Sequence, residues 1–389
     1  MTCSQRPAVS ISLAVLLMVL AACSRTDISE ERTMKIAFFE DASVPDHIDL
    51  VSPSYLAFDT VMQRRVVEAR GIAVEVVRID AGTDAATAIE MSHDVAADPA
   101  YVLALVSPFW QEPPEVARIL AEAGVPTMSL SPESASPWIS DASMPGDAAE
   151  LWRRFVPDRA TEIQLLAETI GSSPGDETQA VCLVSDGSDY GSRLVSGIEP
   201  MLGSLPSIVI DGVDADAAAD EVTTSGCRVV FWGGFPPGAR DLARAMSEIG
   251  TSRGRPVDLA GDALKTAIPP TSPAGDGVVV GSVSCPCADV SVQIDLASRR
   301  FLNVYQSEHG LTPGVYAAEA WDAGRIVAGA LTSGATSRAD VRIIFRSLTA
   351  YEGVVRTYTF DADGEPIGIR AELFVAAGTR WLPIPARQG

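Results

Sequence analysis

The sequence predicts an α/β protein with two doubly wound parallel-sheet lobes. Short β-rich apolar runs alternate with amphipathic segments of about 10–15 residues, which is typical of strand–helix–strand units and a parallel sheet. This alternation starts near residue 34 and starts again near residue 180, so it indicates two sheets. The 356 residues from 34 onward are also too many for one hydrophobic core and suit two lobes.

The N-terminal apolar run has the proportions of a signal peptide. Residues 8–22 are mostly apolar and follow Arg6, but the run is shorter than the ~20 residues that a spanning helix needs. The run ends in "LAAC", which resembles a bacterial lipobox with Cys23 as the lipidated residue. The sequence thus predicts a lipoprotein signal peptide over 1–22 and a lipidated tether over 23–33. An ordinary secretory signal with an incidental cysteine is the alternative.

The first set of predicted elements follows the tether. Its strand-like runs are "MKIAFFE" (34–40), "AVEVVRID" (73–80), "YVLALVS" (101–107) and "PTMSL" (126–130). Helical stretches are predicted between them, including 55–70 and 113–123. These elements form the first predicted sheet.

The second set repeats the same order. Its strand-like runs are 180–186, 207–213, 228–234, 256–262 and 277–283, with helices that end near residues 202 and 249. The pattern is then helical to about residue 348, and it ends in two strand-like runs, 354–364 and 372–383.

Charge and composition exclude several classes of protein. The formal net charge is −22, and such an acidic chain is a poor candidate for nucleic-acid binding, which depends on Lys and Arg. No apolar run after residue 23 approaches spanning length, so lipid on Cys23 is the one predicted membrane anchor. The three histidines are scattered and "SCPC" has no second cysteine pair, so no metal site is predicted. No cofactor is predicted either.

Cys182 and Cys227 fall in two apolar runs that read as buried strands. If the strands are parallel neighbours, the two cysteines are offset by several ångströms, which is awkward for a disulfide. The sequence therefore favours two buried thiols at these positions. Cys285 and Cys287 are expected to be free or locally paired thiols.

Seven segments in order resemble the branched-chain amino-acid substrate-binding family of ABC importers, which are type I periplasmic binding proteins. They extend over nearly all of residues 34–365. They are "DPAYVLALVSPF", "AGVPTMSLSPESAS", "FVPDRATEIQLLA", "VCLVSDGSDYGSRL", "VVFWGGFPPGARDLARAMSEIG", "FLNVYQSEHGLTPGVYAAEAWDAGRIVAGAL" and "TFDADGE".

The resemblance implies three crossings between the lobes and a hinged ligand cleft. The crossings are expected near 156, 284 and 352, which gives lobe 1 as 34–156 plus 285–351 and lobe 2 as 157–284 plus 352–389. The implied function is an extracytoplasmic lipoprotein that captures a small polar solute, such as an amino acid or a related amide. It would deliver that solute to the permease and ATPase subunits of an ABC importer. A receptor lipoprotein that signals ligand occupancy to a membrane partner is the alternative.

Candidate ligand-binding residues lie in the loops at the carboxyl ends of the strands, where open α/β sheets bind ligands. Hydroxyl groups suited to a ligand carboxylate are those of Ser107, Ser131 and Ser134, although each could be a helix cap or turn residue. The resemblance places Asp262 near a ligand ammonium, and a solvated loop aspartate is the alternative.

The remaining candidates are bulky or charged. Tyr190, Phe235 and Tyr316 match aromatic positions of the family, and the two tyrosines could instead be core residues. Trp110 and Glu133 stand where the family usually has small residues. Glu133 could repel a ligand carboxylate and favour an amide, a polyamine-like cation or a different ligand orientation.

The sequence carries no recognisable catalytic motif. No Gly-x-Ser-x-Gly pattern joins a predicted strand to a following helix, and there is no dinucleotide fingerprint and no phosphate loop. A binding protein is predicted rather than an enzyme.

Overall fold

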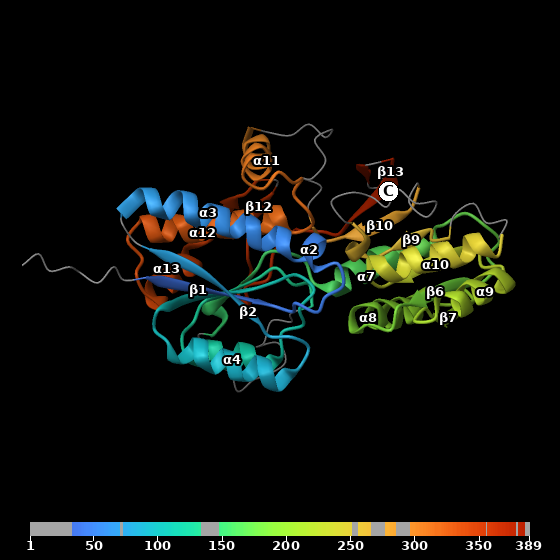
Figure 1. Cartoon of the computed structure of the whole chain (residues 1–389), viewed down its shortest axis with the longest axis horizontal. Helices are drawn as coiled ribbons and strands as arrows, with labels where there is room; N and C mark the ends of the chain where they lie inside the picture. Colours follow the sequence, from blue (N-terminus) through green and yellow to red (C-terminus); the bar gives the residue numbers. More distant parts are fainter. Residues whose placement is uncertain are drawn as a thin grey trace, which may run out of the picture.

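The computed structural model describes residues 33–70, 73–133, 148–250, 256–265, 277–284, 296–354, 356–378 and 380–385. Two lobes, each with its own large sheet, lie along the long axis of the molecule (Figure 1). The predicted fold class is therefore confirmed. The signal peptide with nearly all of the tether, Cys23, Ser134, Cys285 and Cys287 lie outside the described residues.

The first sheet has five parallel strands in the order β2-β1-β3-β4-β5. Its strands are β1 (Met34–Glu40), β2 (Val74–Asp80), β3 (Tyr101–Val106), β4 (Thr127–Ser129) and β5 (Trp152–Arg154). The residues of β1 alternate between two hydrophobic clusters, because successive side chains of a strand point to opposite faces. The sheet is thus covered on both faces.

Helices from distant parts of the chain cover those faces. Packed around this sheet are α2 (His47–Leu50), α3 (Ser52–Arg70), α4 (Ala85–Ala97), α5 (Pro114–Glu122), α12 (Ala317–Thr332) and α13 (Arg338–Ser347). In Figure 1, α3 and α12 lie together on one side of the sheet and α4 lies on the other. The short helix η1 (Ala148–Leu151) leads into β5.

The second sheet has seven strands in the order β14-β13-β10-β9-β8-β6-β7. Its strands are β6 (Val181–Ser185), β7 (Ser207–Asp211), β8 (Val229–Gly233), β9 (Leu259–Ala260), β10 (Val279–Ser282), β13 (Glu372–Ala377) and β14 (Arg380–Ile384). The first five of these pair in parallel, and β13 joins β10 antiparallel. A parallel sheet with an antiparallel edge is common in α/β folds.

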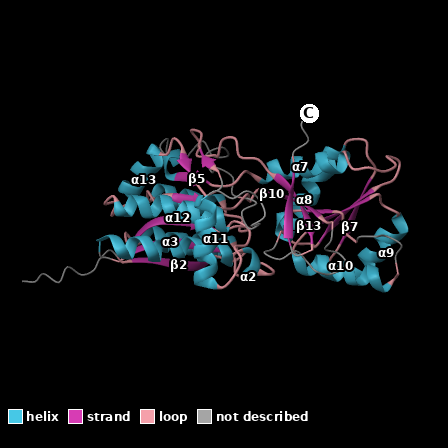
Figure 2. Cartoon of the chain, turned by 90° about the horizontal axis from the view of Figure 1, so that it is seen from above, coloured by secondary structure: helices cyan, strands magenta, loops and turns pink. Residues whose placement is uncertain are grey.

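Helices also cover both faces of this second sheet (Figure 2). They are α7 (Arg159–Gly171), α8 (Asp189–Ile198), α9 (Ala215–Ser225) and α10 (Pro236–Glu248), with the short helices η2 (Glu199–Leu202) and η3 (Asp262–Leu264). The side chains of Asp158, Ser188 and Asp214 accept hydrogen bonds from backbone N–H groups and cap three of these helices. Each cap sets the residue at which the loop after a strand ends and the helix begins.

The late part of the chain returns to the first lobe before it joins the second sheet. After α11 (Leu296–His309), α12 and α13 come the short strands β11 (Tyr351–Glu352) and β12 (Thr357–Tyr358). The rings of Tyr358 and Phe360 contact Phe155, and Glu365 pairs with Arg154. The lobe limits stay a prediction, and these contacts favour a third crossing between residues 367 and 372 rather than at 352.

The last strand-like run, 372–383, forms a hairpin instead of one strand. Gly378 has φ of 58°, and the chain reverses there so that Ala377 pairs with Arg380. Glycine tolerates this left-handed conformation, which makes it the natural point for the turn.

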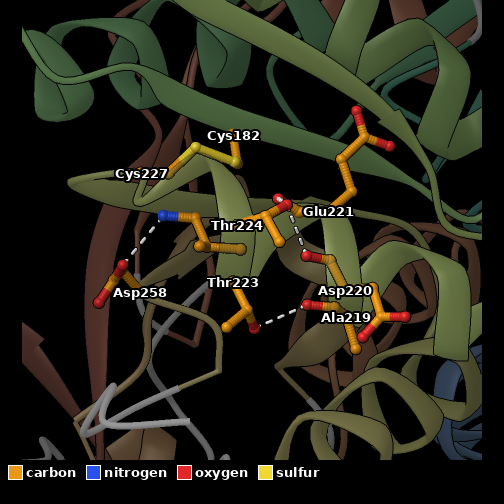
Figure 3. The surroundings of a disulfide bond; sticks show 9 residues. Cys182, Ala219, Asp220, Glu221, Thr223, Thr224, Cys227 and Asp258 are labelled. Atoms are coloured by element: carbon orange, nitrogen blue, oxygen red, sulfur yellow. Dashed lines mark hydrogen bonds between the residues drawn. A yellow bond between two sulfur atoms is a disulfide. The ribbon is translucent and has the colours of Figure 1, made fainter. Parts of the chain in front are cut away.

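Cys182 and Cys227 form a disulfide, so the prediction of two buried thiols is wrong (Figure 3). The prediction treated Cys227 as a strand residue, whereas β8 begins at Val229. Gly226, with φ of 59°, ends α9 and turns the chain, which brings the two cysteine Cα atoms to 5.7 Å. A structural disulfide suits a protein exported to an oxidising compartment.

Candidate functional site

A pocket of about 350 Å³ lies between the two lobes at the carboxyl ends of their strands. The first lobe contributes the loops that follow β1, β2 and β3, and the second contributes the starts of α8 and α10. Both lobes therefore form its walls. The lining residues are Asp41, Ser43, Val44, Pro45, Gly82, Thr83, Phe109, Trp110, Gln111, Ser188, Asp189, Tyr190, Arg193 and Phe235.

Phe109 of the first lobe fills the base of this pocket. Its ring centroid lies 5.6 Å from Tyr190 and 6.0 Å from Phe235, both of the second lobe, and 5.6 Å from Tyr316. All three contacts are edge-to-face, the arrangement that aromatic rings prefer. Phe109 is only 5% exposed, so its side chain occupies the space in which the two lobes meet.

The backbone around the pocket holds three unusual conformations. Among the described residues, the non-glycine residues with positive φ are Asp46, Phe109 and Tyr316. Such conformations are costly for residues with a side chain and are found at functional sites. Phe109 and Tyr316 meet in the aromatic group, and Asp46 pairs across the lobes with Arg240.

Below the aromatic group lies a buried cluster centred on Arg159. Its Nε atom is 2.6 Å from Glu133 of the first lobe, its Nη1 atom is 2.9 Å from Asp262, and it also contacts Glu162. Its guanidinium carbon lies 4.9 Å from the centre of the Tyr190 ring, a cation–π distance. Burial disfavours the positive charge of the guanidinium and on its own would lower the pKa. The carboxylates of Asp262 and Glu133 outweigh this effect and raise the pKa of Arg159.

Asp262 is fully buried and already has several partners. It accepts hydrogen bonds from Arg159 and from the hydroxyl groups of Tyr190, at 2.8 Å, and Tyr316. Burial, together with the neighbouring Asp262 carboxylate, raises the pKa values of both tyrosines, so they stay protonated and donate. Tyr316 belongs to the first lobe, and its bond is therefore a further link between the lobes.

The structure divides the predicted site residues into three groups. Trp110, Tyr190 and Phe235 line the pocket. Glu133, Asp262 and Tyr316 lie below it in contact with the buried cluster.

The third group consists of the serines. Ser107 and Ser131 are fully buried, and the Ser131 hydroxyl donates to the Trp110 carbonyl oxygen at 2.8 Å, while Ser134 lies outside the described residues. The ligand-binding roles of all nine residues stay predictions.

Sequence reasoning did not identify the residues that dominate this interface. Arg159 opens α7 in "PDRATE", three residues before Glu162, a spacing typical of exposed helix pairs. Asp41 and Arg193 line the pocket but stand in no pattern that marks them. Their positions after β1 and in the first turns of α8 were the available signal.

Glu112, in the loop between β3 and α5, gives a testable pH dependence. It is 7% exposed, Oε1 has no hydrogen-bond partner among the described residues, and burial raises the pKa of its carboxyl to about 8. Because the folded state keeps a proton that the unfolded state releases, stability is complete below the unfolded pKa and falls as pH rises through this range.

We therefore expect Glu112→Gln to flatten the pH dependence of unfolding. Between pH 5 and pH 7 the wild type should lose about 3 kcal/mol more than the variant, at roughly 1.4 kcal/mol per pH unit. Urea denaturation of both proteins at each pH measures this difference. Asp322, whose pKa burial raises to about 7, contributes equally to both proteins and cancels. Parallel stability profiles would refute the assignment.

No metal-binding or membrane-spanning feature occurs in the described part of the chain. No group of three or more His, Cys, Asp and Glu side chains there could hold a metal ion. Likewise, none of its helices combines the length and apolar character needed to cross a membrane.

The sequence matches the periplasmic binding protein family over residues 51–371. A sequence comparison with curated proteins gives no match. Many solved structures share the fold.

A solute-binding protein of an ABC transporter from R. palustris, in complex with benzoate, has a TM-score of 0.71 and 15% identity, over 90% of this chain and 95% of that chain. A leucine-binding protein from Thermotoga maritima has a TM-score of 0.69 and 15% identity, over 90% and 98%. The branched-chain amino acid transporter substrate-binding protein from Streptococcus pneumoniae, in complex with isoleucine, has a TM-score of 0.64 and 16% identity, over 90% and 99%.

At these identities the structural likeness shows the fold, and the family match spans most of the chain. Proteins of this family bind solutes outside the cytoplasm and are not enzymes. The chain belongs to the periplasmic binding protein family.

Proposed function

We propose that this protein captures a small polar solute in the pocket between its lobes and delivers it to the permease and ATPase subunits of an ABC importer. The observation that carries the proposal is the pocket itself, whose walls come from the strand ends of both lobes. Amino acids and related amides, which the sequence predicts, are the first solutes to test. The family match and the complex of a structural neighbour with isoleucine support this choice.

Two experiments test the proposal in sequence. A thermal-shift and calorimetry screen against amino acids, amides and amines should identify a ligand, since a ligand at 100 times its dissociation constant adds about 2.7 kcal/mol to stability. Deleting the gene should then abolish uptake of that solute by the cell. Unchanged uptake together with tight binding would contradict delivery to an importer and point to a sensing role.

The membrane anchor is a separate part of the proposal. The Leu20–Cys23 box supports lipidation of Cys23, with residues 24–33 as the tether. We expect Cys23→Ser to move the protein from the membrane fraction to the soluble fraction, measured by fractionation and immunoblotting. Cys3→Ser, which changes a cysteine outside the box, is the control. Retention of the Cys23→Ser protein in membranes would refute the anchor.

A further inference from the structure

Several donor groups of the first lobe at or beside the pocket are taken by the chain's own carboxylates. The N–H groups of Ala42 and Gly82 donate to Asp80 at 3.0 and 3.2 Å. Both the N–H and the hydroxyl of Ser43 donate to Oδ1 of Asp41, at 2.8 and 2.6 Å. A solute that needs donors, such as a carboxylate, finds these groups already occupied.

The start of α10 at the pocket, and that of α5 close to it, supply few donors. Proline has no backbone N–H, and α5 begins at Pro113-Pro114 while α10 begins at Pro236-Pro237. The N–H of Phe235, before α10, donates to Asp186 at 2.7 Å. The usual anion site at a helix start is therefore lost at both helices.

Acidic side chains offset the positive end of α8 and the positive charge of Arg193. Asp189 lies in the first turn of α8, so it places a negative charge where an anion would otherwise bind. Arg193 lines the pocket, but its Nε atom donates to Glu133 at 2.9 Å and its Nη1 atom contacts Gln111.

The pocket has unused capacity to accept hydrogen bonds. Asp41 lines the pocket and is only 7% exposed, and its Oδ2 atom accepts no hydrogen bond from any described residue. The carboxylate of Asp189 is exposed at the same pocket and has no partner in the described part of the chain. A buried carboxylate is stabilised most by a positively charged donor.

The walls of the pocket favour the same kind of group. Phe109, Trp110, Tyr190 and Phe235 line it, and aromatic ring faces attract cations through their quadrupole. The pocket thus combines apolar surface, acceptors and a negative balance of charge.

We propose that the solute is a small organic cation, an amine or amidine on an apolar body, and that the pocket does not bind a carboxylate group. This inference rests on the proposed function, because it assigns the substrate class of the same pocket. The positive group would lie against Asp41 and Asp189, with the apolar body against the aromatic walls. An α-amino acid would also bring a carboxylate close to Asp41 and Asp189, which would repel it.

A matched set of compounds tests the inference by calorimetry. It comprises 2-phenylethylamine, L-phenylalanine, 3-phenylpropionate and phenylacetamide, with 3-methylbutylamine and L-leucine as an aliphatic pair. We expect each amine to bind at least roughly tenfold more tightly than its amino acid, and the carboxylate to bind most weakly.

Two variants test which carboxylate binds the positive group of the solute. Asp41→Asn should weaken amine binding at least about tenfold, and the exposed Asp189→Asn about threefold. Asp94→Asn, an exposed aspartate on α4 outside the pocket, is the matched control and should change nothing. Circular dichroism checks the fold of each variant, and Asp189→Asn keeps the test valid if Asp41→Asn does not fold.

The outcomes separate this inference from the proposed function. If L-phenylalanine, L-leucine or 3-phenylpropionate binds as tightly as the amines, the substrate class is overturned while solute binding stands. Amine affinities unchanged within twofold in folded Asp41→Asn and Asp189→Asn proteins would also overturn it. If no compound of this set or of the wider screen binds, both the inference and the proposed function fail.

Discussion

Replacing Arg159 with methionine should lower the free energy of unfolding by about 3–5 kcal/mol, the usual loss when one partner of a buried ion pair is removed. Arg159 is the cation that Glu133, Glu162 and Asp262 share, and the side chains of all four residues are buried. Without it, Glu162 and Asp262 have no ion-pair partner among the described residues, and Glu133 keeps only Arg193. Methionine keeps much of the side-chain volume, so the loss reports on charge rather than on a cavity.

Arg240→Met is the matched control for this prediction. Arg240 also links the lobes, through Asp46, but its side chain is 52% exposed. Exposed ion pairs contribute roughly 0–1 kcal/mol, so this variant should stay close to the wild type. Urea denaturation followed by circular dichroism measures both variants. Equal, small losses in the two proteins would show that the Arg159 cluster is not a major source of stability.

The Arg159 cluster also changes what Asp262 is expected to do. From the sequence, Asp262 is a candidate partner for a ligand ammonium, but in the structure a guanidinium of the same chain lies against its carboxylate at 2.9 Å. The aromatic group above it is likewise filled by Phe109 rather than open. A solute therefore meets the outer pocket first, where Asp41 and Asp189 are the acidic groups.

The sequence predicted the fold because the fold depends on periodic signals. Strand-like runs such as 101–107 and 180–186 appear in the structure as β3 and β6, within one or two residues. The loops after those strands were also predictable as the site, since carboxyl strand ends of open sheets face the ligand. Trp110, Tyr190 and Phe235 do line the pocket.

The pairings within the site were not predictable, because they join residues that are distant in the chain. Arg159 and Asp262 are separated by 103 residues, and Glu133 and Arg193 by 60. No local pattern records such contacts. Phe109 lies in the loop after β3, but its position between three rings depends on how the two lobes meet.

The disulfide could not be predicted from the sequence either, although its two cysteines are closer together in the chain. A strand register inferred from apolar runs placed Cys227 in β8 and too far from Cys182. The structure ends α9 at Ser225 and begins β8 at Val229, so Cys227 lies in the turn between them. One glycine in a left-handed conformation decides that geometry, and its conformation cannot be read from hydrophobic periodicity.

Removing this disulfide should lower the stability of the second lobe by about 4 kcal/mol. The bond joins residues 45 positions apart, and such a link stabilises mainly by reducing the conformational freedom of the unfolded chain. We expect the Cys182→Ala, Cys227→Ala double variant to unfold at a clearly lower urea concentration than the wild type. Paired alanine substitutions avoid leaving one reactive thiol.

A reductant provides the control, because it removes the cross-link without changing the packing of the side chains. Cys182 is fully buried and lies in the hydrophobic cluster with Val222 and Val230, so the alanines also remove some packing. Dithiothreitol during denaturation should therefore bring the wild type most of the way to the double variant and leave the variant unchanged. If dithiothreitol does not alter the wild-type transition, the stabilisation comes from packing and the cross-link contributes little.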